Sequence, residues 1–328
     1  MARRADRTSG ERAEDARSLP DRQEPRVMAD FLISIATYKR PELLADLLRS
    51  LEPEVVGEDV RIAVVDNHAE GTGRAVCEAS PLDIEYVIEP RPGIAAARNR
   101  GLDLVREDDR FLIFVDDDER VHPGWLRSLA DAQQRYDADV ISGPVVSVLP
   151  ADAPAWIARG GFIQRARFRT GDPSLSPATN NTLVRLDYLR SLGSPRFDEG
   201  FSMTGGSDTA FFRVLRDAGA RMIWCDEAVV DEDVPAERAN FAWIWRRGIR
   251  EGNVSGRMLL RQRSRTKVVV AGLARIAYGS AATARDVVLG RGVQARSTAY
   301  ITRGLGWIGA SRGRLVTEYA RPTESVEG

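Results

Sequence analysis

Four acidic residues stand together directly after a short apolar run. The run from Phe111 to Val115 is followed by Asp116, Asp117, Asp118 and Glu119. Carboxylates this close repel one another, and a divalent cation relieves the repulsion; oxygen ligands without nearby His or Cys favour Mg²⁺ or Mn²⁺. Alternation along an extended segment points Asp116 and Asp118 to the same side, as a cation bridging to a diphosphate requires. The alternative is a solvated acidic turn that caps the next helix.

Two further polar clusters follow apolar runs. Asp66 and Asn67 close the run that starts at Val60, and a lone carboxylate at such a place commonly meets a ribose hydroxyl or a base edge. An ordinary turn is the alternative. The first run ends in the segment 36–41, Ala-Thr-Tyr-Lys-Arg-Pro, which offers a hydroxyl, an aromatic face and two cations beside a predicted helix start. Without glycines, this segment is neither a dinucleotide fingerprint nor a P-loop.

These clusters need a scaffold of alternating strands and helices. Nearly continuous apolar strands are typical of a parallel sheet covered by helices on both faces, and ligands gather at the carboxyl ends of such strands. We therefore predict an α/β fold with a mainly parallel central sheet. The expected strands are Phe31–Ala36, Val60–Val65, Ile84–Ile88 and Phe111–Val115, and the expected helices include Pro41–Leu51, Ile94–Val105 and Thr209–Ala218.

The order and spacing of several motifs resemble those of the family 2 glycosyltransferases, most closely the ExoM-like polysaccharide enzymes. The motifs are ISIATYKRPELL, AVVDN, EPRPGIAAARNRGLD and FVDDDE, followed by ATNNTLVRLDYL and the segment from FDEGF to VPAER. The resemblance covers about 210 residues, from Phe31 to roughly Arg238. It implies the GT-A fold and a nucleoside-diphosphate sugar as the donor substrate.

The resemblance also implies roles for single residues. Asp116 to Asp118 match the family's DXD element, which binds the donor diphosphate through the metal, so Asp116 and Asp118 are the expected metal ligands and Asp116 and Asp117 the diphosphate contacts. Asp66 is expected to contact the base. The other expected donor contacts are Thr37, Tyr38, Arg40, Arg91 and Arg98.

The catalytic base is expected at Asp208. In the family, a Glu-Asp pair precedes a helix and its Asp is the base; here Ser207 replaces the Glu and Asp208 remains. The alternative is a helix N-terminal acid stabilised by the helix dipole. The implied reaction inverts the sugar in a single displacement. It transfers a hexose, from UDP-hexose in our prediction, to a hydroxyl of a glycan or of a polyprenyl-pyrophosphate-linked acceptor, in the synthesis of cell-surface polysaccharide or glycoconjugate.

Charge is divided unevenly along the chain. Between Arg246 and Arg314, 15 Arg and Lys face two acids, whereas the net charge of the whole chain is -1. Arg247 stands beside Trp243 and Trp245 and is expected to bind the pyrophosphate of either the donor or the acceptor, with a solvated helix as the alternative. The basic segment also favours contact with an anionic membrane surface. It contains no recognisable nucleic-acid module, so we expect no nucleic acid partner.

Composition limits the remaining possibilities. The chain has 328 residues, of which 43% are hydrophobic, and its two Cys and two His exclude a disulfide framework and a zinc cluster. No apolar run is long enough to span a bilayer, and the charged N-terminus does not resemble a signal peptide. We expect a cytoplasmic protein and leave open its peripheral attachment to the inner face of the cell membrane.

Three segments follow from these patterns. Residues 1–28 have almost no large apolar side chains and are expected to be disordered. Residues 29–238 form the catalytic domain, with a nucleotide-binding half at 29–118 and an acceptor half at 119–238, and residues 239–328 form a basic helical extension. Two other functions stay open: a sugar nucleotidyltransferase, although TYKRP lacks the glycine-rich loop of that class, and a noncatalytic membrane-associated scaffold of the same fold.

Overall fold

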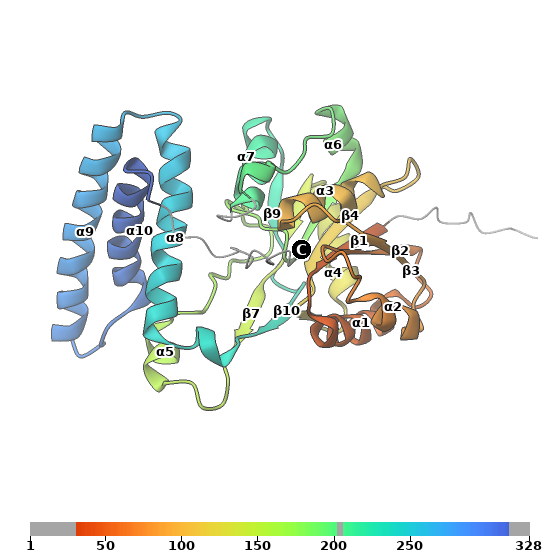
Figure 1. The fold of residues 1–328 in the computed structure, drawn as a ribbon, viewed down its shortest axis with the longest axis horizontal. Helices are drawn as coiled ribbons and strands as arrows, with labels where there is room; N and C mark the ends of the chain where they lie inside the picture. Colours follow the sequence, from red (N-terminus) through yellow and green to blue (C-terminus); the bar gives the residue numbers. More distant parts are fainter. Residues whose placement is uncertain (1–30, 202–205, 315–328) are drawn as a thin grey trace, which may run out of the picture.

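The computed structural model describes residues 31–201 and 206–314. A seven-stranded sheet lies at its centre (Figure 1). Its strands are β1 (Phe31–Thr37), β2 (Val60–Asp66), β3 (Ile84–Ile88), β4 (Phe111–Asp116), β6 (Val140–Ser142), β8 (Thr182–Arg185) and β9 (Met222–Trp224). The helices that follow or precede them are α1 (Pro41–Val55), α2 (Arg74–Ala79), α3 (Ile94–Asp103), α4 (Trp125–Tyr136), α5 (Ala155–Gly160), α6 (Leu186–Ser191) and α7 (Ser207–Asp217).

The strands run in the order β3-β2-β1-β4-β8-β6-β9. The first four are mutually parallel, whereas β8 is antiparallel to both of its neighbours. Strand β1 lies between β2 and β4, so three carboxyl ends meet at one edge of the sheet. The predicted α/β fold is confirmed, and each predicted strand agrees with the structure to within one residue.

Helices cover both faces of the sheet because the strands are apolar on both sides. One core contains Leu47 of α1 and Trp125 of α4, both fully buried, against side chains such as Ile33 of β1. The other core contains Ala95 of α3 and Phe211 of α7. Helix α1 continues to Val55, four residues beyond the predicted end, and its last turn still contributes to the first core.

A second, three-stranded sheet begins where β4 ends. It consists of β5 (Glu119–Val121), β10 (Val230–Asp233) and β7 (Val145–Val148), with β10 between the other two. Because β5 starts at Glu119, the acidic run turns directly from one sheet into the other. Strand β10 therefore brings the segment around Glu232 beside the acids, although more than 110 residues separate them along the chain.

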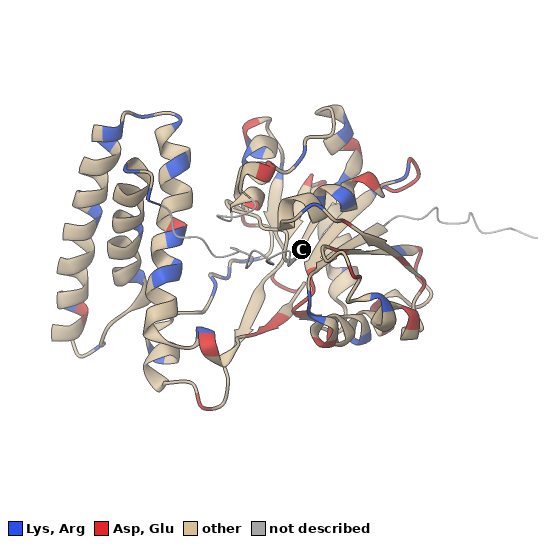
Figure 2. Cartoon of the chain, in the orientation of Figure 1, with Lys and Arg blue, Asp and Glu red and all other residues tan. Residues whose placement is uncertain are grey.

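Three long helices make up the end of the described chain. They are α8 (Phe241–Leu260), α9 (Arg265–Val288) and α10 (Ala295–Ser311), and they stand together beside the sheets and the helices that cover them (Figure 1). Basic side chains are spread along all three, and acidic ones are few (Figure 2). The predicted basic helical segment agrees with these three helices as far as residue 314. Its boundary at residue 239 remains a prediction. The tail predicted to be disordered, residues 1–28, lies outside the described residues.

Glycines allow these helices to approach closely. On α8, Gly248, Gly252 and Gly256 are spaced four residues apart and face α10. A Cβ at Gly252 would lie 2.6 Å from the backbone oxygen of Arg303 and 2.9 Å from the Cα of Gly306. Backbone-to-backbone contact of this kind leaves no room for a side chain, so the spacing fixes which face of α8 is turned toward α10.

Candidate active site

The sheet brings the predicted donor residues to one edge. In the strand register, Thr37 of β1 stands opposite Asp66 of β2, and Ala36 stands opposite Asp116 of β4. The carboxyl ends of neighbouring parallel strands are where α/β proteins bind their ligands. The three clusters found in the sequence are therefore neighbours in space.

The three aspartates of the acidic cluster each have a side-chain partner. The Asp117 carboxylate accepts a hydrogen bond of 2.7 Å from the Thr37 hydroxyl. The Arg40 guanidinium lies 2.9 Å from Asp118 and 3.3 Å from Asp117. From the other side, Arg98 on α3 lies 3.2 Å from the Asp116 carboxylate. The structure therefore places Thr37, Arg40 and Arg98 around the acidic cluster.

Burial raises the pKa values of these acids. The pKa of Asp116 rises to about 6 through desolvation, which nearby Arg98 partly offsets and the charge of Asp118 reinforces. Desolvation also raises the pKa of Asp117 to about 7, and the positive charge of Arg40 partly offsets this rise. Desolvation also raises the pKa of Glu119 well above its usual value. The two arginines therefore do not fully compensate the negative charge, and an added cation would be stabilised here.

The donor set suits a metal ion that is shared with a substrate. Asp116 and Asp118 keep 31% and 18% of their side-chain surface exposed, so both can reach a ligand at the strand ends. Within the described ranges, no three His, Cys, Asp or Glu side chains form a complete cation cage. Mg²⁺ typically takes one or two carboxylates and completes its shell with water and phosphate oxygens. Two carboxylates therefore fit a cation that arrives together with a diphosphate.

Asp66 is held by its own surroundings. Its carboxylate is fully buried and accepts hydrogen bonds from the backbone N–H of His68 and Gly73 at 2.9 and 2.7 Å and from the Tyr86 hydroxyl at 2.8 Å. These bonds fix the loop that follows β2. A direct contact with a base, as predicted, would require Asp66 to exchange one of these partners.

Tyr38 stands next to this loop. Its ring lies edge-on to that of His68, with the centroids 5.5 Å apart. The backbone at Lys39 is in the left-handed region, with φ of 54°, and its ammonium lies 5.6 Å from the centre of the Tyr38 ring. The turn after β1 thereby places an aromatic face and a cation beside His68, in the loop that follows β2.

A network of polar side chains holds the segment that contains Arg91. Asn67 donates to the backbone oxygens of Glu89 and Arg91 and accepts from the N–H of Gly93. Arg91 forms a two-pronged ion pair with Glu89 and a bond of 3.1 Å to Glu199, and its side chain stays 55% exposed. The pKa of Glu89 is lowered, chiefly by its hydrogen bond from Arg91. Arg91 is thus anchored at the rim of the site and accessible to a ligand.

Asp208 is the second residue of α7. The helix begins at Ser207, and the preceding Gly206 adopts the left-handed conformation, with φ of 96°. One Asp208 oxygen accepts from the backbone N–H of Thr209 at 2.7 Å, and the side chain is partly exposed. A Cβ at Gly206 would collide with Val254 of α8 at 2.5 Å, so α8 packs directly against Gly206, the residue before α7.

Arg247 lies apart from these residues, on α8. Its guanidinium is 3.4 Å from Glu251 and 5.3 Å from the centre of the Trp243 ring. It lines a cavity between the C-terminal helices and the segment 161–166. The structure therefore groups Arg247 with a second site and not with the acidic cluster.

Sequence reasoning missed Arg165, which forms an ion pair with Glu232 of β10. Its charge lowers the pKa values of both Asp116 and Glu119, so it counts among the cations facing the acidic cluster. Arg165 belongs to an irregular segment without a motif. Only the pairing of β10 with β5 places its partner beside the acids, and nothing local in the sequence signals this.

Residues 32–193 match the family described as Glycosyl transferase family 2. The chain is 38% identical to succinoglycan biosynthesis protein ExoM of Rhizobium meliloti (strain 1021) over 239 residues, which cover 69% of this chain and 74% of that protein. It is 23% identical to the glucosyl-dolichyl phosphate glucuronosyltransferase of Haloferax volcanii, over 67% of this chain and 74% of the relative.

Solved structures show the same fold. The crystal structure of S. aureus TarS 1-349 in complex with UDP superposes with a TM-score of 0.51 at 17% identity, covering 89% of this chain and 93% of that one. The crystal structure of GalNAc-T7 with UDP, GalNAc and Mn²⁺ has a TM-score of 0.50 at 13% identity, covering 65% of this chain and 45% of that one. These likenesses confirm the predicted GT-A fold. The match to the family and the 38% identity to ExoM show that the chain belongs to glycosyltransferase family 2.

Proposed function

We propose that this glycosyltransferase is a metal-dependent, inverting enzyme that moves a hexose from a UDP-sugar to a hydroxyl of a lipid-linked glycan in cell-surface polysaccharide synthesis. The observation that carries the proposal is the acidic cluster at the end of β4, where Asp116 and Asp118 stay partly exposed beside the guanidinium groups of Arg98 and Arg40. A cation with a diphosphate would complete this arrangement of charge. The 38% identity to a succinoglycan biosynthesis protein supports the polysaccharide context.

Asp116 and Asp118 are the proposed metal ligands. A bound cation would act as a Lewis acid and neutralise the charge that develops on the departing nucleoside diphosphate. Arg98 and Arg40 already contact the two acids, and in the loaded site their guanidinium groups would turn toward phosphate oxygens. Asp117, which is held by Thr37, keeps the turn between the two ligands in place.

The nucleoside is proposed to lie over the loops that follow β1 and β2. Tyr38 supplies an aromatic face beside His68, and Thr37, at the end of β1, stands opposite Asp66. Arg91, at the exposed rim, is placed to close over the nucleoside. UDP is present in the solved structures of two proteins with this fold.

Asp208 is the proposed base. It would accept the proton of the acceptor hydroxyl while the oxygen of that hydroxyl bonds to the anomeric carbon of the donor. The bond from that carbon to the diphosphate oxygen breaks in the same step, and the electron pair leaves with the nucleoside diphosphate. A single displacement of this kind inverts the configuration. The partly exposed position of Asp208 at the start of α7 leaves it open to a hydroxyl.

A panel of donors tests the proposal. The purified protein is heated with UDP-, GDP- and dTDP-sugars, each with and without Mn²⁺. Because a ligand that binds only the folded state raises the melting temperature, we expect a shift that requires both a UDP-sugar and the cation. A sugar nucleotidyltransferase would instead respond to a nucleoside triphosphate. A noncatalytic scaffold would bind donor without transfer or hydrolysis.

We extend the proposal to an anionic membrane surface as a partner, with the protein on its cytoplasmic side. Helix α9 exposes a row of apolar side chains, among them Val270, Leu273 and Val288 with 60%, 55% and 85% of their surface exposed. Basic residues flank this row, whereas Asp286, the one acid on α9, is fully buried. In the part of the chain that the structure describes, no helix is both long and apolar enough to cross a membrane. An apolar row flanked by bases suits the interface of an anionic bilayer.

Vesicle binding checks this surface. We expect the protein to sediment with vesicles of phosphatidylcholine and phosphatidylglycerol. The substitution Leu273→Glu should weaken binding to these vesicles by about tenfold or more, because burying a Leu side chain is worth about 1.5–3 kcal/mol. Val56→Glu, at a still more exposed apolar side chain directly after α1, is the control and should bind like the wild type. The proposed membrane surface is wrong if the wild type and both variants bind the vesicles equally, or if the wild type does not bind anionic vesicles.

A further inference from the structure

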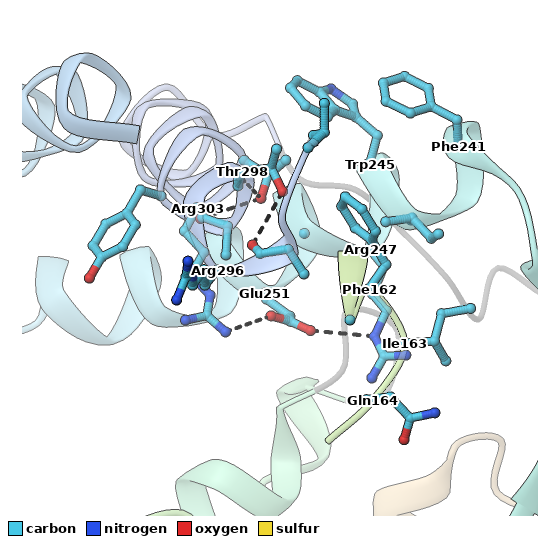
Figure 3. A pocket seen from close by; sticks show the side chains of 18 of the residues that line it. Phe162, Ile163, Gln164, Phe241, Trp245, Arg247, Glu251, Arg296, Thr298 and Arg303 are labelled. Carbon is cyan, nitrogen blue, oxygen red and sulfur yellow. Dashed lines mark hydrogen bonds and ion pairs between the residues drawn. The ribbon is translucent and has the colours of Figure 1, made fainter. Parts of the chain in front are cut away.

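A cavity of about 980 Å³ lies between the C-terminal helices and the segment 161–166. Most of its lining comes from α8, α10 and this segment (Figure 3), and Trp156 of α5, Arg275 of α9 and Val293 complete it. One lining residue, Arg165, forms an ion pair with Glu232, which stands opposite Glu119 in the pairing of β10 with β5. The cavity therefore adjoins the strand that pairs with the end of the acidic cluster, and none of the acids of that cluster lines it.

The lining of this cavity carries a net positive charge. Five arginines and a single acid, Glu251, line it. Two of these arginines, Arg165 and Arg296, also pair with acids outside the lining, Glu232 and Asp286, so five arginines stand against three acids. Glu251 is already shared, at 2.9 Å from Arg303 and 3.4 Å from Arg247, and the three side chains lie in a row along the wall (Figure 3). Such a surplus of guanidinium groups selects an anion, and their planar forks match phosphate oxygens in particular.

Arg275 adds a donor with no partner. Its Nε is buried and makes no hydrogen bond within the described chain. The guanidinium stacks on Trp307 and Tyr300, with its central carbon 4.5 and 5.3 Å from the ring centres. A buried donor without an acceptor is costly, so an incoming acceptor oxygen at this wall would be stabilised.

The opposite wall is apolar. Trp156 and Phe162 meet edge-to-face at 5.1 Å, and Phe241 and Trp245 stack at 5.6 Å. Phe241 is 63% exposed although it is a large hydrophobic residue. An aromatic surface left open beside a row of arginines suits a ligand with a charged end and an apolar end.

We propose that this cavity binds the phosphate or diphosphate ester of an amphiphile, with the head group on Arg247, Arg303 and Arg275 and the first apolar units along Trp245 and Phe241. If the proposed function holds, this site anchors the lipid-linked acceptor while its sugar reaches Asp208; the binding itself requires no turnover. A neutral glycan is disfavoured, because Glu251 is occupied by two arginines and Gln164 is the one amide on the lining.

Tryptophan fluorescence of the full chain tests the site, since Trp156 and Trp245 line it. The titration uses farnesyl diphosphate below its micelle concentration, in EDTA, so that a metal-dependent donor site does not contribute. We expect saturable binding that is about tenfold or more tighter than that of inorganic pyrophosphate or farnesol, because both the charged and the apolar walls are needed. UDP should not compete.

Variants locate the binding. Arg247→Gln should weaken farnesyl diphosphate binding by about tenfold, whereas Arg246→Gln, at the neighbouring exposed residue that does not line the cavity, should not. Phe241→Ala, at a side chain too exposed to matter for folding, should weaken farnesyl diphosphate but not pyrophosphate. Equal binding of short-chain phosphatidic acid supports the site and assigns its ligand to a lipid headgroup.

Three results overturn the proposal. They are pyrophosphate binding as tight as the farnesyl ester, competition by UDP, and unchanged affinity in Arg247→Gln. None of these results depends on catalysis. A failure of the proposed function would look different: the protein would show no Mn²⁺-dependent change in melting temperature with a UDP-sugar, while farnesyl diphosphate would still bind.

Discussion

Asp208→Asn is expected to lower the rate of sugar transfer by about 10²–10⁴-fold, the usual contribution of a general base. The amide keeps the size of the side chain and can still accept the hydrogen bond from the Thr209 N–H, but it cannot take up the acceptor proton. Binding of UDP with Mn²⁺ should be unchanged, because the base is not among the proposed donor contacts. Initial rates with donor and acceptor, and thermal shifts with UDP, separate the two effects.

The control is Asp217→Asn at the other end of the same helix. Its side chain is 62% exposed and pairs only with Arg213 and Arg216 on α7 among the described contacts. We expect a wild-type transfer rate. If Asp208→Asn also transfers sugar at the wild-type rate, the base assignment is wrong and Asp208 is an ordinary acid at a helix N-terminus.

Asp118→Asn is expected to lower the rate of sugar transfer by about 10³-fold. A metal ion acting as a Lewis acid stabilises the transition state by several kcal/mol, and each 1.36 kcal/mol corresponds to about a factor of ten in rate. The substitution removes one of two proposed metal ligands and retains the shape of the turn. Chelation of the metal from the wild type should produce the same loss. Asp131→Asn, at an exposed acid on α4, serves as the control. Full activity of Asp118→Asn in EDTA would show that the cation plays no part.

The same site predicts a pH dependence. Because burial raises the pKa of Asp116 to about 6 and that of Asp117 to about 7, protons compete with the cation over this range. The carboxylates are charged above these values and neutral below them, so the apparent affinity for Mn²⁺ should fall as the pH is lowered from 8 through 6. Titration of the UDP-dependent thermal shift with Mn²⁺ at several pH values measures it. A constant affinity across this range is the contrary outcome.

The strands and the order of the motifs were predictable from local sequence. Each strand of the nucleotide-binding half is a short apolar run, and apolar periodicity is set by neighbouring residues. The acids after β4 and the Thr-Tyr-Lys-Arg turn after β1 were identified because they follow such runs directly. Their meeting at one edge follows from the parallel order of the sheet, which the family resemblance also implied.

The partners of these residues were not predictable. The predicted base contact at Asp66 stays a prediction, but the sequence does not reveal that its carboxylate accepts hydrogen bonds from Gly73 and Tyr86, which lie seven and twenty residues away along the chain. Arg165 stands in a segment with no pattern of its own. Hydrogen bonds and ion pairs of this kind depend on where distant loops are brought by packing, and packing is a property of the whole chain.

The sequence by itself determined the fold class, the acidic cluster, the base candidate at the start of α7 and the basic character of the C-terminal segment, because each is written in a few neighbouring residues. Only the tertiary structure decided that Arg247 lines a cavity that the acidic cluster does not line, and that α8 packs against Gly206 at the start of α7. The physical reason is that glycine spacing along α8 and α10 sets how closely the helices pack, and this packing turns one face of α8 toward its neighbour and leaves another to line the cavity.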